Sequence, residues 1–437
     1  MEMKTNVKRD VYIVDGARTP FLKAKGKPGP FSASDLAVSA GRELLARQPF
    51  SPEDLGEVIL GCMMPSPDEA NIARVVALRL GCGKSMPAFT VQRNCASGMQ
   101  SIDSAVKDIA TGRHELVLAG GTEAMSRAPL LFNNSMVNWM AGLWSAKGLS
   151  TKVKQWLKFR PANLVPVVAL LRGLTDPMVN LSMGQTAENV AYRFNITREQ
   201  MDLFALESHQ RVANAQDNNY LADVLSAYDY TGGVYQADDG VRRDTSLEKL
   251  ASLKPIFDKK FGSVTAGNSS QVTDGAALLL LASKDAVKKY KLPVLAKVVD
   301  TEWAGLEPTE MGLGPVYAST SLMHRYNMRL DDIDFWEINE AFAAQVLGCL
   351  AAWEDEDYCR KHLGLKNAFG RIDPNRLNVD GGAVALGHPV GASGARIVLR
   401  LANILKRKQA QRGIASICIG GGQGGAMLIE NVSEVTA

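Results

Sequence analysis

Short apolar runs alternate along the chain with segments whose apolar residues recur at helical spacing. The runs at 11–14, 58–60 and 116–119 are each followed by a glycine or a turn. Between the first two, leucines and alanines within 36–45 fall on one face of a helix. Continuous apolar strands separated by amphipathic helices are typical of buried sheets in an α/β fold. We therefore predict an α/β protein.

The same elements recur in the same order in the two halves of the chain. In the first half, Ala-Ser-Gly at 96–98 opens a helix, and the next strand ends in Gly-Gly at 120–121. In the second half, Ala-Ser-Gly at 392–394 opens a helix, and the next strand ends in a glycine run that begins at 420. This repetition predicts two related α/β halves that join near residues 291–293.

The composition excludes several classes of protein. The 49 basic residues nearly balance the 46 acidic ones, so we expect no nucleic-acid partner. None of the six cysteines forms a Cys-x-x-Cys pair, which argues against a disulfide framework, and we expect no metal site. Residues 1–10 show no secretory signal, and no apolar stretch approaches the ~20 residues of a membrane-spanning helix. We therefore expect a cytoplasmic protein.

One segment departs from this even distribution of charge. Residues 124–175 contain no acidic residue, yet they hold three of the six tryptophans and several lysines and arginines. A basic amphipathic segment with aromatic anchors can lie on an anionic membrane surface, here through 137–172, or dock a partner protein. It can equally pack on its own domain and cover a substrate entrance. Composition does not separate these alternatives.

Cysteine and histidine residues supply the candidate chemistry. Cys95 follows the apolar run at 88–91 and precedes a helix, so its thiol faces the positive end of the helix dipole and we expect a lowered pKa. His388 precedes the second Ala-Ser-Gly, so the repeat places it as a base near Cys95. Cys418 ends the strand that enters the glycine run and can line the same cleft. A strand-like run follows these glycines, whereas a dinucleotide-binding loop requires a helix, so we expect no nucleotide cofactor.

Four spaced blocks resemble the signature motifs of the thiolase family. They are Asn-Cys-Ala-Ser-Gly at 94–98, Asn-Glu-Ala-Phe at 339–342, Gly-Gly-Ala-Val-Ala-Leu-Gly-His-Pro at 381–389 and Cys-Ile-Gly-Gly-Gly-Gln-Gly-Gly at 418–425. The likeness extends from residue 11 to residue 428. It implies a thiolase-like fold of two pseudo-duplicated α/β halves with a loop domain inserted in the first. The expected parts are an N-terminal half of 1–123 and 254–292, an inserted loop domain of 124–253 and a C-terminal half of 293–437.

The resemblance also implies a role for each candidate. Cys95 would attack the 3-keto carbon of a 3-oxoacyl-CoA while His388 accepts its proton, and Cys418 would protonate the acetyl-CoA enolate. Asn339, through a water, and His388 would stabilise the thioester oxygen of that enolate. The backbone N–H groups of Cys95 and Gly420 would stabilise the acyl-enzyme oxygen.

Coenzyme A is expected as a substrate, and no cofactor is expected. The segment 262–270 resembles the family's pantetheine loop, and Arg242 aligns with a basic residue near the nucleotide part of CoA. Ser182 stands where short-chain biosynthetic thiolases would carry histidine. This departure and the basic insertion resemble the thiolase subunit of fatty-acid oxidation complexes. The expected substrate and CoA contacts are Arg242, Phe257, Ala266, Ser270, Met183 and Phe342.

The resemblance therefore predicts a 3-ketoacyl-CoA thiolase of fatty-acid β-oxidation, forming a homodimer or homotetramer and acting beside a hydratase/dehydrogenase subunit. The same residues would serve an acetyl-CoA C-acetyltransferase that makes or cleaves acetoacetyl-CoA, since only the acyl pocket distinguishes the two. Ketoacyl synthases share the fold but carry Cys-His-His or Cys-His-Asn. A sterol- or lipid-transfer protein with a thiolase-like body should lack the intact catalytic set.

Overall fold

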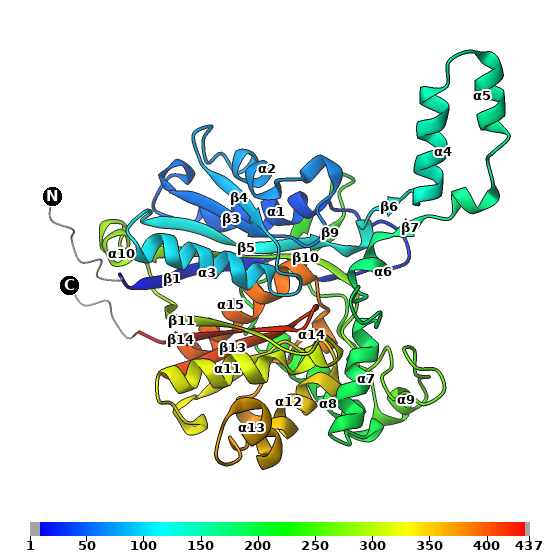
Figure 1. The fold of residues 1–437 in the computed structure, drawn as a ribbon. Helices are drawn as coiled ribbons and strands as arrows, with labels where there is room; N and C mark the ends of the chain where they lie inside the picture. The colour runs from blue at the N-terminus through cyan, green and yellow to red at the C-terminus, as the bar shows by residue number, and fades with distance from the viewer. Residues whose placement is uncertain (1–8, 433–437) are drawn as a thin grey trace.

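The computed structural model describes residues 9–432. In the sequence, the charged segment 1–10 shows no secretory signal. Positions 1–8 of that segment lie outside the described residues. Ten strands form one hydrogen-bonded sheet whose two parts lie in separate layers (Figure 1). The two parts are joined where residues 11–13 pair with 296–298.

The first part of the sheet has the order β4-β3-β5-β10-β1. β3 is parallel to both β4 and β5, whereas β10 is antiparallel to β5 and β1. The short β2 pairs with β10. These strands are β1 (Val11–Arg18), β2 (Leu22–Lys23), β3 (Glu57–Gly61), β4 (Ala88–Val91), β5 (Leu116–Ala124) and β10 (Thr273–Ser283).

The second part repeats this arrangement with the order β12-β13-β14-β11. β12 and β13 are parallel, and β14 is antiparallel to β13 and β11. β12, β13, β14 and β11 thus correspond to β3, β5, β10 and β1, and the internal repeat is confirmed. The strands are β11 (Ala296–Gly305), β12 (Phe335–Ile338), β13 (Arg412–Ile419) and β14 (Gln423–Glu430).

Helices lie between the two sheet layers and on their outer faces (Figure 1). The outer helices α1 and α2 cover the first layer, and α11 and α12 cover the second. The helices of the two halves are α1 (Ala33–Ala46), α2 (Ile72–Arg79), α3 (Ser97–Ala110), α10 (Lys284–Tyr290), α11 (Gly314–Arg325), α12 (Ala343–Glu354), α13 (Glu356–Leu363), α14 (Ala383–Leu386) and α15 (Val390–Lys408).

The central layer is formed by α3 and α15, which begin at the two Ala-Ser-Gly motifs. A Cβ atom added to Gly98 would lie 2.8 Å from the carbonyl oxygen of Gly391, and one added to Gly394 would lie 2.6 Å from the backbone nitrogen of Met99. The repeated glycines therefore let the two helix backbones cross in contact. This crossing brings the start of each helix, and the residue before it, to the middle of the molecule.

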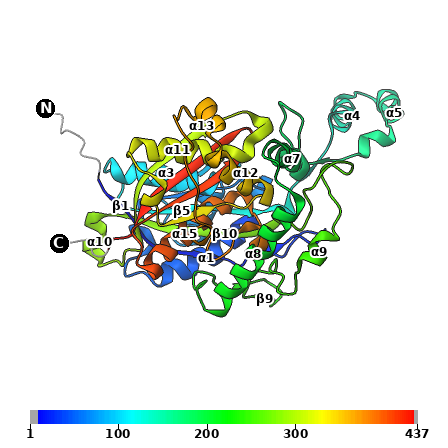
Figure 2. The ribbon, with the colours of Figure 1, turned by 90° about the horizontal axis from the view of Figure 1, so that it is seen from below.

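A helical hairpin projects from the body (Figures 1 and 2). It consists of α4 (Asn134–Ser145) and α5 (Leu149–Trp156), and the short antiparallel ribbon of β6 (Leu130–Leu131) and β7 (Val167–Val168) connects it to the core. Within the hairpin, the Trp139 indole donates to the carbonyl oxygen of Gln155, and its ring contacts those of Trp156 and Phe159 edge-on. Because α4 and α5 pack on each other and stand apart from the body, the alternative that the basic segment packs on its own domain is wrong for this hairpin. The end of the segment, at residues 171–175, lines the cavity described below, so there the alternative stays open.

The rest of the insertion packs on both halves: α7 and α8 contact α12 of the C-terminal half, and β8 contacts α1 of the N-terminal half. Its elements are α6 (Ala169–Gly173), α7 (Met183–Arg193), α8 (Arg198–Asp217), β8 (Ala227–Tyr228), β9 (Val234–Tyr235) and α9 (Leu247–Ala251). The predicted α/β architecture is confirmed, whereas the division at residues 123, 253 and 292 stays a prediction. Within 9–432 no helix is long and apolar enough to cross a membrane.

Candidate active site

Cys95 occupies a tight elbow between β4 and α3. Asn94 adopts a left-handed conformation with φ of 44°, which asparagine tolerates better than most residues. The Asn94 amide donates to the carbonyl oxygen of Gly420 at 2.8 Å, and the Ser97 hydroxyl donates to the carbonyl oxygen of Asn94 at 2.7 Å. The elbow of one half is thus hydrogen-bonded to the glycine run of the other.

The expectation of a lowered thiol pKa at Cys95 is wrong for the protein without substrate. Burial raises the pKa of Cys95 to about 11, although the backbone N–H groups of Gly420 and Cys95 both donate toward its sulfur and lower the pKa. Removing a thiolate from water thus outweighs the helix N-terminus. Cys95 therefore rests as a neutral thiol and needs a base in order to react.

His388 is suited to be that base. The loop geometry fixes its backbone, whose N–H donates to the carbonyl oxygen of Gln271. Its Nδ1 lies 2.6 Å from the Ser393 hydroxyl, which itself donates to the carbonyl oxygen of Pro389. Because that hydroxyl has only one proton, Nδ1–H must be the donor to Ser393, and Nε2 is left with its lone pair. Nε2 makes no hydrogen bond within the described residues. Burial, and then the Arg396 charge, lower the pKa of His388 to about 3, which keeps the ring neutral.

Cys418 lies at the end of β13 and is fully buried. Burial, and then the neighbouring Cys95 and Cys349, hold the pKa of Cys418 well above its ordinary value. Cys418 is therefore a protonated thiol, able to give a proton to a strong base and to take one back. With Cys95 and His388, it lines one cavity of about 510 Å³.

The cavity also collects the residues that the sequence assigned to substrate and CoA. Its wall is largely apolar, with Leu171 and Leu174 from the end of the insertion. Nine of the eleven predicted site residues line it, namely Cys95, Met183, Arg242, Phe257, Ala266, Ser270, Phe342, His388 and Cys418. Residues from both halves and the insertion thus enclose one space.

Asn339 and Gly420 do not line the cavity but touch residues close to it. A Cβ atom on Gly420 would lie 3.2 Å from the Met183 sulfur, so a larger residue there would require the Met183 side chain to shift. Asn339 follows β12 and is fully buried. Its carbonyl oxygen accepts from Arg396, while its Nδ2 makes no hydrogen bond within residues 9–432.

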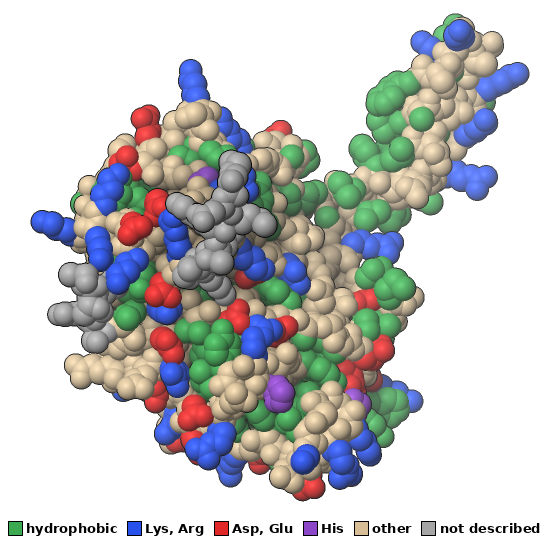
Figure 3. Space-filling view, turned by 60° about the vertical axis from the view of Figure 1, so that its left-hand side comes forward, with side chains coloured by type: hydrophobic (Ala, Val, Ile, Leu, Met, Phe, Trp, Pro, Cys, Tyr) green, Lys and Arg blue, Asp and Glu red, His purple; other side chains and the backbone are tan. Residues whose placement is uncertain are grey.

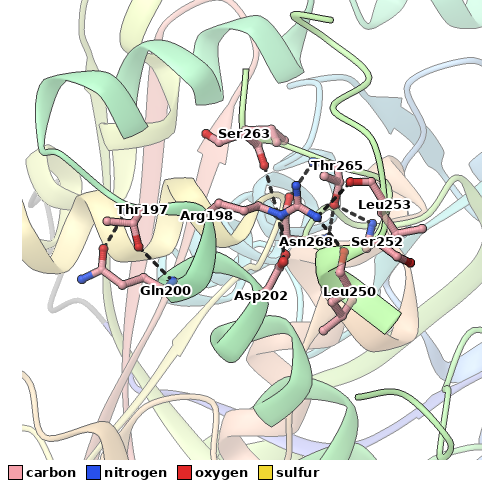
Figure 4. A network of polar contacts seen from close by, with 12 residues as sticks. Thr197, Arg198, Gln200, Asp202, Leu250, Ser252, Leu253, Ser263, Thr265 and Asn268 are labelled. Atoms are coloured by element: carbon pink, nitrogen blue, oxygen red, sulfur yellow. Dashed lines mark hydrogen bonds and ion pairs between the residues drawn. The ribbon is translucent and has the colours of Figure 1, made fainter. Parts of the chain in front are cut away.

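The segment 262–270 is held by a polar network with α8 and α9 (Figure 4). The Asn268 amide accepts from the backbone N–H of Thr265 and donates to Asp202. Arg198 pairs with Asp202 and also donates to the carbonyl oxygens of Leu250 and Leu253. The loop is therefore held by hydrogen bonds within the protein itself.

A basic hollow adjoins the cavity. Arg242 and Ala266 line both spaces, and His209 and Lys249 line the hollow. His209 accepts a hydrogen bond from the backbone N–H of Arg242 at 3.1 Å. Burial, and then the Arg242 charge, lower the pKa of His209 to about 4, so it stays neutral. Lys249 pairs with Asp244, which also lines the hollow, so Arg242 is the cation there that has no ion pair among the described residues. An apolar cavity that opens beside this cation fits a ligand with an apolar arm and an anionic end.

Three buried polar residues of the centre were not predicted. Ser393 was part of the second Ala-Ser-Gly motif, and its place five residues after His388 was the available signal. Arg396 interrupts an apolar helix, and Glu123 ends the first glycine-containing strand. The Glu123 carboxylate accepts from the backbone N–H groups of Met63, Met64 and Gly391, so it joins the first half to the start of α15.

Comparisons with known proteins agree with this geometry. The family models for the N-terminal and C-terminal domains of thiolase match residues 11–285 and 292–431. The mitochondrial 3-ketoacyl-CoA thiolase of Bos taurus is 39% identical over 430 residues, covering 97% of this chain and 99% of that protein. A crystal structure of human mitochondrial 3-ketoacyl-CoA thiolase in complex with CoA is similar with a TM-score of 0.83 and 37% identity, covering 98% of this chain and 99% of that one.

A second solved structure has a different printed activity. The acetyl-CoA acetyltransferase of Bacillus anthracis is similar with a TM-score of 0.82 and 36% identity, covering 98% of this chain and 100% of that one. The fold and the matched models define an acyltransferase built from two related halves. The chain belongs to the thiolase family, and the resemblance seen in its motifs is confirmed.

Proposed function

We propose that the chain cleaves 3-oxoacyl-CoA with CoA, giving acetyl-CoA and an acyl-CoA two carbons shorter, as in fatty-acid β-oxidation. The observation that carries this proposal is the convergence of Cys95, His388 and Cys418 on one cavity. A thiol beside a lone-pair imidazole provides a nucleophile and its base, and a second protonated thiol provides an acid. The bovine relative named as a 3-ketoacyl-CoA thiolase supports the same reaction.

In the first half-reaction, His388 Nε2 takes the proton of Cys95 as the sulfur attacks the 3-keto carbon. The bond between C2 and C3 then breaks, leaving the shortened acyl group on Cys95 and the acetyl-CoA enolate. Cys418 protonates C2 of that enolate. In the second half-reaction, the Cys418 thiolate takes the proton of the CoA thiol, and the CoA thiolate attacks the thioester on Cys95. Acyl-CoA leaves, and protonated His388 returns its proton to the Cys95 sulfur.

Two oxyanions need separate donors in this sequence. The N–H groups of Cys95 and Gly420 already donate toward the Cys95 sulfur, so they are close to the acyl oxygen that forms there. We assign Asn339 Nδ2, through a water, and His388 to the thioester oxygen of the enolate. Asn339 lies outside the cavity lining, which fits an indirect contact.

CoA would enter with its thiol end toward Cys95. Ser270 and Ala266, on the loop 262–270, would contact the pantetheine, with Phe257 and Phe342 packed edge-on at 5.8 Å beside it. Arg242 would lie near the nucleotide part, in the basic hollow. Met183, beside Gly420, would contact the acyl group.

The experiment is CoA-dependent thiolysis by the purified protein over 3-oxoacyl-CoA substrates from C4 to C16. Turnover that rises with chain length supports the degradative thiolase. Turnover confined to C4 supports the second candidate, an acetyl-CoA C-acetyltransferase, which the likeness to the Bacillus anthracis enzyme favours. Absence of turnover at every length contradicts both.

The hairpin suggests a surface for an anionic lipid bilayer. Trp144, Leu149 and Leu157 are 80%, 80% and 81% exposed, and the hairpin has no acidic residue to neutralise its lysines. Apolar and basic side chains occupy different sides of it (Figure 3). Exposed tryptophan and leucine enter the interfacial region of a bilayer, and lysines bind anionic headgroups.

Sedimentation with vesicles tests this surface. The wild type is expected to bind vesicles containing phosphatidylserine more than vesicles of phosphatidylcholine alone, and Trp144→Ser with Leu149→Ser should reduce that binding. Tyr230→Ser, at a loop away from the hairpin, is a matched control because Tyr230 is 84% exposed. Equal binding by the hairpin variant would contradict a membrane contact through the hairpin, and a hydratase/dehydrogenase subunit stays the other partner expected from the sequence. A homodimer or homotetramer and a cytoplasmic location remain proposals from the sequence.

A further inference from the structure

A buried guanidinium connects two polar residues at the end of β12. Arg396 on α15 is 2% exposed, and its Nη1 lies 3.2 Å from a carboxylate oxygen of Glu337. Its Nη2 donates to the side-chain carbonyl oxygen of Asn339, also at 3.2 Å. Glu337 lies in β12, and Asn339 directly follows its last residue, Ile338. Residues two apart on extended backbone face the same side, so one planar guanidinium reaches both.

This contact decides which end of the Asn339 amide faces away from α15. A guanidinium donates five N–H groups and accepts none, so it can bind only the oxygen of the amide. A flipped amide would bring NH₂ against the guanidinium and leave both donors without an acceptor. Arg396 therefore holds Oδ1 and directs the Nδ2 donor away from itself.

We propose that Arg396 is a positioning residue that fixes the amide of Asn339 with Nδ2 available to stabilise the enolate. This inference rests on the proposed function, because it needs Asn339 as a donor in carbon–carbon cleavage. The Asn339 backbone is fixed independently, since its N–H donates to the carbonyl oxygen of Ser416. What remains for Arg396 to determine is the orientation of the side chain.

The same helix face orients the other enolate donor. Ser393 is one helical turn before Arg396, and it holds Nδ1 of His388. Residues three apart lie on one face of a helix. The first turns of α15 thus set the amide of Asn339 and the tautomer of His388 together, which makes α15 the common support of both donors.

Comparing the rates of the two half-reactions distinguishes a positioning role of Arg396 from a general effect on stability, which would lower both rates. Exchange of labelled CoA into an acyl-CoA requires Cys95 to attack a thioester and release CoA, and it forms no enolate. Thiolysis of 3-oxoacyl-CoA requires the enolate. Arg396→Lys keeps the positive charge but cannot present two parallel donors to Glu337 and Asn339. We expect its thiolysis kcat to fall about 10²-fold, as when one oxyanion donor is lost, while exchange stays within about threefold.

Arg400→Lys is the matched control. Arg400 lies one turn further along α15, is 3% exposed and pairs with Asp223 and Asp380, but it does not contact Asn339. It should leave the ratio of the two rates unchanged. In an Asn339→Ala background, Arg396→Lys should lower the thiolysis kcat by less than about a further twofold, because the amide that Arg396 positions is absent.

Three results would overturn the proposal. The first is an equal loss of exchange and thiolysis in Arg396→Lys, and the second is unchanged thiolysis in that variant. The third is a further loss of thiolysis of about 10²-fold when Arg396→Lys is added to Asn339→Ala. If Arg396→Lys does not fold, the pair Glu337→Gln with Arg396→Met removes both ionisable groups together, and the same selective loss of thiolysis is expected. A wild type without thiolysis at any chain length would refute the proposed function itself, a distinct outcome.

Discussion

At the proposed reaction centre, Cys95, His388 and Cys418 are 9%, 8% and 0% exposed, whereas no residue of α4 or α5 is buried. The centre is enclosed by both halves, and its polar atoms are fixed by hydrogen bonds to distant parts of the chain. The hairpin contacts the body through its ribbon and is held together by its own tryptophans. Substitutions at the centre should therefore change chemistry, and substitutions in the hairpin should change only what the protein binds.

The largest expected effect comes from Cys95→Ala. Loss of the nucleophile should lower thiolysis by at least about 10⁴-fold, since a reaction unit without its attacking group retains little catalysis. Steady-state kinetics and a thermal melt check this. Cys82→Ala, at another buried cysteine that does not line the cavity, should retain activity. Comparable turnover in both variants would contradict the assignment of Cys95.

The second prediction concerns pH. Without substrate, the rate of Cys95 alkylation by iodoacetamide should be slow at neutral pH and should rise about tenfold per pH unit up to about pH 10. Only the thiolate reacts, and the pKa of Cys95 is raised to about 11. Peptide mass spectrometry of timed samples follows the modification. A plateau near pH 8 would instead indicate that the helix N-terminus outweighs burial.

A smaller loss is expected for Ser393→Ala. Without the hydroxyl, Nδ1 of His388 loses its acceptor and the tautomer with a free Nε2 is no longer favoured. Thiolysis and CoA exchange should both fall about tenfold, because His388 serves both half-reactions. This differs from Arg396→Lys, which should affect thiolysis alone. Ser319→Ala is the control, since that buried hydroxyl has no hydrogen-bond partner within 9–432. A selective loss in Ser393→Ala would contradict the shared role.

The smallest effect is expected for excision of the hairpin. Replacing residues 132–166 with Asn-Gly would close β6 and β7 with a two-residue turn. Because α4 and α5 contribute no buried residue, kcat on a C4 or C6 substrate should stay within about twofold and Tm should change little. Differential scanning fluorimetry and kinetics check both. A strong loss on these substrates would mean that the hairpin supports the centre after all.

Much of this architecture could be predicted from the sequence, because local signals determine it. Apolar runs gave the strands, and the two Ala-Ser-Gly motifs with the thiolase blocks gave Cys95, His388 and Cys418. Arg396 could not be predicted, since a charge in a helix usually indicates a solvated face and only the packed structure pairs it with Glu337. The direction of the Cys95 pKa shift could not be predicted correctly. The sequence around Cys95 reveals the helix N-terminus, which lowers the pKa, whereas the burial that raises it depends on the whole fold.

The projection of the hairpin could not be predicted for the same reason. Helical periodicity around Trp144 and Trp156 identifies an apolar face but does not say what covers it. Here Trp139 turns inward between the two helices and Trp144 stays exposed. Helical spacing alone therefore does not predict which of these tryptophans turns inward and which stays exposed.

The central claim is that Cys95 carries the acyl group after carbon–carbon cleavage. The most direct test is intact-protein and peptide mass spectrometry after rapid quenching of the enzyme with 3-oxooctanoyl-CoA in the absence of CoA. The account predicts a hexanoyl group, two carbons shorter than the substrate chain, on the peptide that contains Cys95, with one acetyl-CoA released per site. An unshortened 3-oxooctanoyl adduct, an adduct on Cys418 or no adduct would contradict it.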